Sequence, residues 1–259
     1  MNNLGITLQK AGKLKEAEKI QRQVLTAQQE VLGNTHPDTF SSMNSLGVTL
    51  QRAGKLKEAE EIQRQVLNAQ QQVLGNSNLD YFGSMNNLAN TLAIVGKLKE
   101  AEEIQRQALT AQQEVLGNSH PDTFNSMNSL GNTLQRAGKL KEAEEIQRQV
   151  LAAQQAILGK NHPDTFDSIH SLGIILQKAG KLKEAEEIQR QVLAAQQEVL
   201  GNSHPDTLSS MNNLANTLQR AGKLKEAEEI QRQVLAPKYR DSLSIFNKLS
   251  ILMNMKNKY

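Results

Sequence analysis

A unit of 42 residues is written about six times into this chain, almost letter for letter, and this period constrains the fold more than any other feature. Residues 53–64 read AGKLKEAEEIQR. Near-copies of that string begin at Ala11, Val95, Ala137, Ala179 and Ala221. A fixed period of this length is typical of a solenoid, in which each unit buries its apolar face only against its neighbours. The chain therefore needs no single central core.

One unit has the pattern of two helices. Apolar or small residues recur at three- and four-residue steps from residue 40 to residue 50, which is the spacing of one helical face. Pro37 suits the first turn of this helix, because its missing N–H is not needed there, and Ala53-Gly54 ends it. A second apolar stripe begins at Leu56 and runs for about 20 residues, or ~30 Å of helix. Gly75 follows it and suits a C-cap with positive φ. The sequence thus predicts an all-α solenoid whose unit is helix A, tight turn, helix B and short loop.

The spacing of bulky and small residues resembles the tetratricopeptide repeat signature. Leu46-Gly47 matches its Leu-Gly pair, Gly54 its turn glycine and Ala59 its buried alanine. The usual unit has 34 residues, and the longer unit here is similar to the repeats of kinesin light chains and their relatives. The resemblance covers residues 1 to about 236, although Gln63 stands where an aromatic residue is common. It implies a right-handed α-solenoid superhelix of tandem helix-turn-helix repeats that interacts with other proteins.

The repeat pattern divides the chain into two parts. Residues 1–236 are predicted to form the solenoid, and its first unit is truncated because Met1 aligns with Met43. The chain is either a piece of a longer array or a solenoid with a short first helix. Residues 237–259 are amphipathic, and we expect a helix that caps the last repeat. A membrane-surface helix and a disordered tail are the alternatives for this segment.

Composition excludes several classes of function. The net charge of +3 comes from residues 237–259, which hold five basic residues and one acidic residue, so the repeats lack the positive surface that nucleic acid requires. No apolar run approaches the ~20 residues of a membrane span. There is no cysteine, which excludes disulfides and favours a reducing, cytoplasmic location. No cofactor-binding motif appears.

The histidines invite a metal or a catalytic interpretation. Four of them occupy the same loop position before a Pro-Asp pair: His36, His120, His162 and His204. Equivalent positions in stacked repeats are about 10 Å apart, whereas zinc ligands lie ~2 Å from one ion, so we expect helix starts and no metal site. His170 replaces an asparagine of the other repeats, and no serine or carboxylate lies at a regular distance from it in sequence. We therefore predict that the chain is not an enzyme.

The recurring Lys-Leu-Lys-Glu-Ala-Glu-Glu run is interpreted as a solvated face of helix B. Its charges alternate in sign, and Glu60 and Arg64 are placed four residues apart in the order that stabilises a helix.

The non-core positions of helix A form the candidate binding site. In tetratricopeptide arrays the A helices line the concave face, and carboxamides there can both donate and accept hydrogen bonds, so they suit the backbone of an extended peptide. The basic members favour acidic segments, and the resemblance to kinesin light chains implies an additional apolar or aromatic anchor. The predicted groove residues are Asn44, Arg52, Asn86, Asn90, Asn128, Asn132, Gln135, Arg136, His170, Lys178, Asn212, Asn216 and Arg220. The alternative is that these asparagines only solvate an empty helix face.

The sequence therefore predicts a protein-interaction scaffold that binds an extended, acidic peptide segment of a protein partner. The alternative is a structural spacer, or a fragment of a larger multidomain protein, without a ligand of its own. The partner's identity and the oligomeric state are left open by the sequence.

Overall fold

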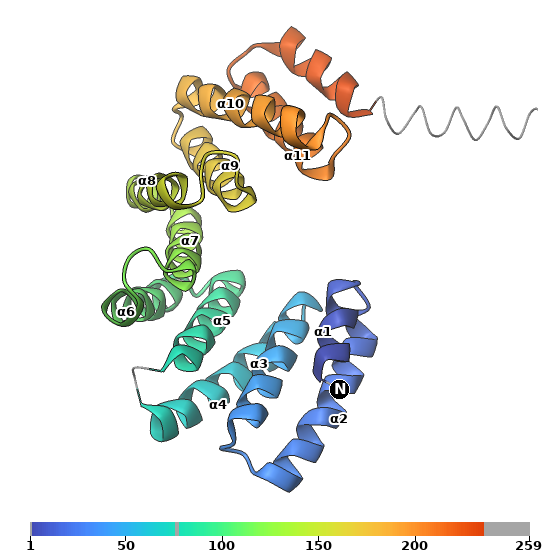
Figure 1. Ribbon diagram of the computed structural model, residues 1–259, viewed down its shortest axis with the longest axis vertical. Helices are drawn as coiled ribbons and strands as arrows, with labels where there is room; N and C mark the ends of the chain where they lie inside the picture. Colours follow the sequence, from blue (N-terminus) through green and yellow to red (C-terminus); the bar gives the residue numbers. More distant parts are fainter. Residues whose placement is uncertain (1, 76–77, 236–259) are drawn as a thin grey trace, which may run out of the picture. The chain divides into compact units, whose positions relative to one another are not determined.

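The described part of the chain consists of helices joined by short turns and loops. The computed structural model describes residues 2–75 and 78–235 (Figure 1). Its helices are α1 (Asn2–Lys10), α2 (Leu14–Leu32), α3 (Pro37–Arg52), α4 (Leu56–Leu74), α5 (Leu79–Val95), α6 (Leu98–Leu116), α7 (Pro121–Arg136), α8 (Leu140–Ile157), α9 (Pro163–Lys178), α10 (Leu182–Leu200) and α11 (Pro205–Arg220), and residues 224–235 are also helical. These two ranges contain no β-strand. The predicted all-α solenoid of tandem helix-turn-helix repeats is confirmed.

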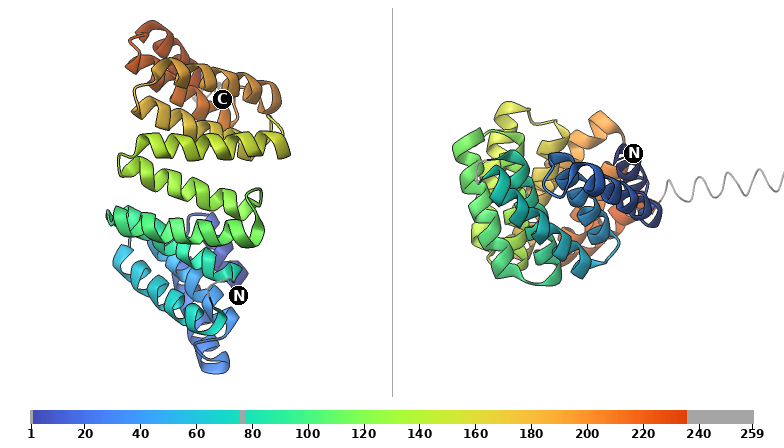
Figure 2. Two further views of the ribbon diagram at one scale, coloured as in Figure 1. Left: turned by 90° about the vertical axis from the view of Figure 1, so that its left-hand side faces the viewer. Right: turned by 90° about the horizontal axis from the view of Figure 1, so that it is seen from below.

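Each repeat pairs an odd-numbered helix A with the even-numbered helix B that follows it. In the repeat made by α3 and α4, the two helices pack against each other, and both also contact α5 of the next repeat (Figures 1 and 2). The tight turn between them places Gly54 at φ +78°, a conformation that glycine adopts without steric cost. The Lys55 N–H donates to the Leu50 carbonyl at 2.9 Å and closes the turn. The helix boundaries predicted around this turn are confirmed.

The histidine loops start the A helices, as predicted. The His36 side chain accepts a hydrogen bond at Nδ1 from the Asp38 N–H, at 3.1 Å, which satisfies one of the unpaired donors of the first turn. His120, His162 and His204 cap their own helices in the same way. Among the described A helices, α5 follows a loop that has asparagine in place of this histidine. There Asn78 Oδ1 accepts the hydrogen bond from the Asp80 N–H, at 2.8 Å.

The core consists of thin layers between neighbouring helices. Leu46, Leu50 and Ala59 form one buried cluster where α3 and α4 meet. Gly47 lies in the same contact, and a Cβ atom on it would come within 2.9 Å of the Gln63 Cγ. The side chain of Gln63 is fully buried there. The small residue on helix A therefore makes room for a glutamine on helix B, which accounts for the glutamine at a position where an aromatic residue is common.

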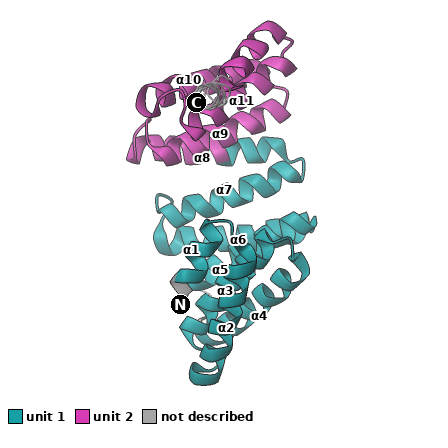
Figure 3. Cartoon of the chain, turned by 90° about the vertical axis from the view of Figure 1, so that its right-hand side faces the viewer, with its two compact units in different colours: residues 1–146 teal, residues 147–259 magenta. Residues whose placement is uncertain are grey.

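The chain forms two compact units, residues 1–146 and residues 147–259, and the boundary lies within α8 (Figure 3). The two units are therefore described separately. The predicted capping helix of residues 237–259 lies outside the described residues. No helix in the described part combines the length and the apolar character that crossing a membrane requires.

Candidate functional site

The predicted groove residues fall on one stripe of each A helix, because most of them are four or eight residues apart and Gln135 lies seven residues after Asn128. On α11 of the second unit, Asn212, Asn216 and Arg220 are all exposed. On α7 of the first unit, Asn132 and Arg136 are exposed. The remaining members divide into exposed cations, namely Arg52 and Lys178, and half-buried side chains, namely Asn44, Asn86, Asn90, Asn128, Gln135 and His170.

The half-buried asparagines connect one repeat to the next. Asn44 Nδ2 donates to the hydroxyl of Ser84 at 2.8 Å, and Asn86 Nδ2 donates to the hydroxyl of Ser126 at 2.6 Å. The Oδ1 atoms of both asparagines are buried without a hydrogen-bond partner. Gln51 makes a parallel contact, since its Nε2 donates to Thr91 Oγ1 at 3.1 Å. Asparagines at this position thus help to hold the stack together, a role that the sequence pattern did not indicate.

In the first unit, the basic row of the stripe is interrupted by an apolar residue. Ile94 on α5 occupies the position that is Arg52 on α3 and Arg136 on α7, and α5 contacts both of those helices. The side chain of Ile94 is 44% exposed. Equivalent positions of neighbouring A helices are about one helix spacing apart, 8–10 Å. The first unit therefore presents an exposed aliphatic side chain between two exposed guanidinium groups.

The B helices carry a ladder of ion pairs that runs from repeat to repeat. Glu60 pairs with Arg64 of its own helix at 2.9 Å and with Lys97 of the next repeat at 2.7 Å, while Arg64 pairs with Glu100 of the next repeat at 2.6 Å. The pair of Glu60 and Arg64 confirms the predicted contact within the helix. The side chain of Glu60 is only 15% exposed.

Equivalent contacts are made by Glu18, Glu102 and Glu186. The first lysine of the run is exposed, as predicted for a solvated face, but it also pairs with a glutamate of the preceding repeat, which the sequence did not indicate. This is so for Lys55, Lys97, Lys139 and Lys223. The hydrogen bond from Lys97 is the main cause that lowers the pKa of Glu60, against the opposing effect of burial.

His170 extends the ladder of helix A contacts in the second unit. Its Nε2 lies 2.7 Å from the Ser210 hydroxyl, and its Nδ1 lies 3.3 Å from Asn213 Nδ2. Because an amide nitrogen can only donate, Nδ1 accepts and the proton sits on Nε2. Burial lowers the pKa of His170, while Asp167 and Asp206 oppose this shift. The imidazole is therefore harder to protonate than that of a solvent-exposed histidine.

The sequence did not indicate the contact of His170 with a serine, because Ser210 lies 40 residues away in the chain. Ser210 is fully buried, and its hydroxyl donates to Gln196 Oε1. His170 in turn donates from Nε2 to the serine oxygen, which is the reverse of the polarity that a general base needs. The pair therefore resembles the contact of Asn44 with Ser84 and joins two repeats.

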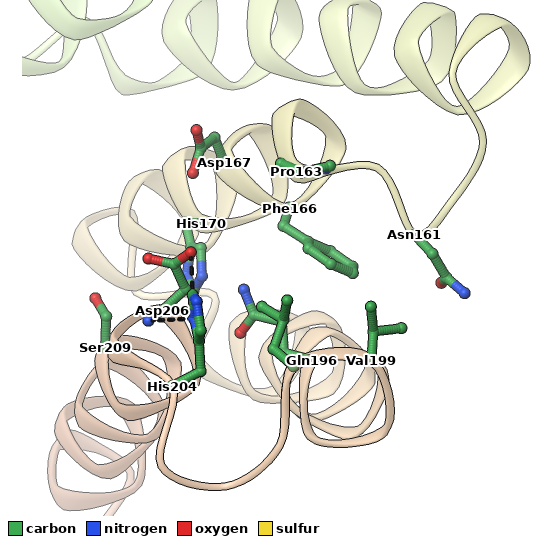
Figure 4. A pocket seen from close by; sticks show the side chains of 11 residues that line it. Asn161, Pro163, Phe166, Asp167, His170, Gln196, Val199, His204, Asp206 and Ser209 are labelled. Atoms are coloured by element: carbon green, nitrogen blue, oxygen red, sulfur yellow. Dashed lines mark hydrogen bonds and ion pairs between the residues drawn. The ribbon is translucent and has the colours of Figure 1, made fainter.

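A cavity of about 460 Å³ lies beside this histidine in the second unit (Figure 4). It is lined by α9 and the loop before it, by the C-terminal end of α10, and by the N-cap and start of α11. The lining residues are Asn161, Pro163, Phe166, Asp167, His170, Gln196, Val199, Leu200, His204, Asp206 and Ser209. In Figure 4 the ring of Phe166 points toward Gln196 and Val199, and His170 approaches Asp206. The volume of the cavity lies within the ordinary range for ligand pockets, about 300–1,000 Å³.

The sequence reasoning missed this cavity, although a signal was present. The position of Asp167 is Ser41, Gly83, Asn125 or Ser209 in other repeats, and the position of His170 is asparagine in them. Both departures fall in one repeat, three residues apart, and both side chains border the same cavity. Among the residues that the structure describes, no group of three or more histidine, aspartate or glutamate side chains is arranged to hold a metal ion.

The fold defines a class of protein, the tandem helical-repeat solenoid. The tetratricopeptide repeat profile matches residues 1–72, 80–156, 128–198 and 164–236. The chain belongs to the tetratricopeptide repeat family. No curated protein is similar enough in sequence to count as a match.

Solved structures place the repeats nearer to one type within this family. A Podosopora anserina protein of nearly identical TPR-like repeats, assigned as a kinesin light chain, is 32% identical with a TM-score of 0.73; the match covers 80% of this chain and 98% of that one. BtubC (BKLC) from P. vanneervenii is 18% identical with a TM-score of 0.67 and covers 90% of each chain. A Rap protein complexed with Competence and Sporulation Factor is 13% identical with a TM-score of 0.63 over 91% of this chain and 73% of that one. The repeats are thus of the kinesin-light-chain-like type, as the sequence predicted, while the two more distant structures share only the fold.

Proposed function

We propose that this chain is a protein-interaction scaffold whose A helices bind an extended, acidic segment of a partner protein. The observation that carries the proposal is the row of Arg52, Ile94 and Arg136 on three adjacent A helices of the first unit. Guanidinium groups pair well with carboxylates, and an exposed isoleucine between them suits an apolar or aromatic anchor. The partner segment therefore carries acidic residues on both sides of an apolar one.

The exposed carboxamides supply the contacts that do not depend on the partner's sequence. Asn132 on α7 and Asn212 and Asn216 on α11 are exposed and can bond to a peptide backbone. Asn44 and Asn86 contribute less, because each already donates to a serine of the next repeat. The proposed contact surface in each unit is therefore the exposed part of the predicted stripe. The absence of cysteine supports a cytoplasmic location as part of the same proposal.

Selection of ligands from a random peptide library on the full chain tests the proposal. We expect enriched peptides with acidic residues around a hydrophobic one. Arg136→Glu should weaken a selected peptide at least about threefold, since loss of an exposed ion pair removes up to ~1 kcal/mol and reversal of the charge adds repulsion. Ile94→Arg, which installs the residue of the neighbouring repeats, should remove the preference for the hydrophobic residue.

A matched control is Lys141→Glu, which makes the same change of charge at an exposed position of α8 in the same repeat as Arg136. This variant should bind the selected peptide as the unmodified chain does. Equal loss in Lys141→Glu and Arg136→Glu would argue against the groove. A library that yields no saturable ligand would favour the alternative of a structural spacer.

A further inference from the structure

The cavity beside His170 is negatively charged and has aliphatic walls. Asp167 borders it from α9 and Asp206 from α11, and none of its eleven lining residues is a lysine or an arginine. Val199 and Leu200 of α10 contribute apolar surface, and Val199 is 54% exposed. A ligand that fits these walls needs a positive charge and an apolar stem.

Two histidines also line the cavity, His170 and His204, and His204 Nδ1 lies 3.6 Å from Asp206 Oδ2. His170 accepts from Asn213 at Nδ1, and burial lowers its pKa, so the neutral imidazole is the favoured form at neutral pH. Burial raises the pKa of Asp167, and Asp164 and Asp206 act in the same direction, while His170 opposes them. A carboxylate that is partly withdrawn from water and faces a second one gains from an incoming cation.

We propose that this cavity binds a basic side chain, arginine or lysine, of the partner protein. Such side chains lay a chain of methylene groups along apolar surface and keep the charged group at a polar rim, which matches Val199 and Leu200 beside Asp167 and Asp206. The proposal extends the proposed function, because it adds a basic residue to a partner segment that is otherwise acidic.

The charges of the A helices in the second unit are consistent with such a partner. Asp167 lies near the start of α9, and Lys178 is its last residue; on α11, Asp206 lies in the first turn and Arg220 is the last residue. The two edges of this face therefore carry opposite charges. A partner segment would place its basic residue at the edge with the cavity and its acidic residues at the other edge.

Fluorine NMR of the full chain labelled with 4-fluorophenylalanine tests the cavity by itself. Phe166 lines the cavity, while Phe40, Phe82 and Phe124 occupy the same position in other repeats and act as internal controls. The signal of Phe166 is assigned with Phe166→Leu, since leucine stands at that position in the last repeat as Leu208. The probes are N-acetyl-arginine amide, its uncharged analogue N-acetyl-citrulline amide, and free arginine.

We expect the arginine amide to shift the Phe166 signal in a saturable way, and the citrulline amide to leave it unchanged. Asp167→Asn, which installs the residue found as Asn125 in the preceding repeat, should weaken this binding about fivefold, as expected for one partly exposed charge pair. Asp38→Asn, which makes the same change at the position equivalent to Asp206 in an earlier repeat, should have no effect.

An equal response to the arginine and citrulline amides, or no saturable response to the arginine amide, overturns the proposal. Tighter binding of free arginine than of the blocked amide also overturns it, because the ligand would then be a small molecule and not a residue within a partner chain. These outcomes concern only the cavity in the second unit. Failure of the groove is detected separately, by the peptide selection and the Arg136→Glu variant.

Discussion

Asn86 of α5 donates a hydrogen bond from its side-chain amide to the hydroxyl of Ser126 on α7, at 2.6 Å, and so links two successive repeats. Asn44 and Ser84 make the same contact one repeat earlier. In the second unit of the chain, His170 and Ser210 occupy the equivalent positions and are also in contact. In a solenoid, stability depends on the interfaces between nearest neighbours. This recurring pair is therefore a contact that sets how firmly one repeat holds the next.

Replacing Asn86 by alanine should destabilise the first unit. The change leaves the buried Ser126 hydroxyl without this donor, which should reduce the free energy of unfolding by about 0.5–1.5 kcal/mol. Asn132→Ala is the control, because Asn132 is exposed on α7 and should change the free energy by less than ~0.5 kcal/mol. Denaturant unfolding of both variants makes the comparison. Equal effects would mean that the contact with Ser126 adds nothing to stability.

Replacing Lys97 by alanine should weaken the ladder of ion pairs on the B helices. Lys97 Nζ lies 2.7 Å from a carboxylate oxygen of Glu60, and its loss should reduce the free energy of unfolding by about 0.5–1 kcal/mol in low salt. Concentrated salt should shrink the difference through screening. Lys99→Ala, at an exposed position of the same helix, should have little effect in either condition. A loss in Lys97→Ala that is independent of salt would contradict an electrostatic origin.

The stability of the second unit should depend on the protonation of His170. Burial lowers the pKa of this base below 6.5 in the folded state, so the unfolded chain binds more protons between the folded and unfolded pKa values. The free energy of unfolding should therefore fall as the pH is lowered from 7.5 through 6.5 and further, until the folded pKa is passed. The groups that face the ring, Asp167 of α9 and Asp206 of α11, oppose the shift without reversing it.

His170→Asn is the variant that isolates this effect, because it installs the residue of the other repeats and can donate to Ser210 as Asn44 does to Ser84. Unfolding curves of both proteins at several pH values give the comparison. The difference in stability between them should change between pH 7.5 and 5.5. A constant difference would show that His170 titrates alike in both states.

Replacing Ala101 by leucine should overpack the contact between helices A and B. Ala101 is fully buried in a cluster with Leu88, Ala89 and Leu92, and the added carbon atoms should cost about 1–3 kcal/mol in the free energy of unfolding. Ala137→Leu, at the exposed end of α7, should cost less than ~0.5 kcal/mol. Thermal or denaturant unfolding distinguishes the two variants. A larger loss in Ala137→Leu would show that the buried face is assigned incorrectly.

The period and the local chemistry of the sequence determined the helices. Pro37 began its helix, Gly54 and Gly75 took positive φ, and the loop histidines started A helices, because these are effects of nearest neighbours along the chain. The family also followed from the sequence, since the Leu-Gly pair and the buried alanine recur at fixed spacing. The stripe of predicted groove residues was likewise readable, because helical spacing alone puts them on one face.

Only the tertiary structure decided what those side chains do. Residues 36 to 43 positions apart come into contact when repeats stack, so the hydrogen bond of Asn86 with Ser126, the ion pair of Lys97 with Glu60 and the contact of His170 with Asn213 could not be read from local spacing. The cavity beside Asp167 and His170 has the same origin, since its walls come from three helices. Which side chains meet depends on how closely one repeat packs on the next. That distance is set by the buried side chains between the repeats.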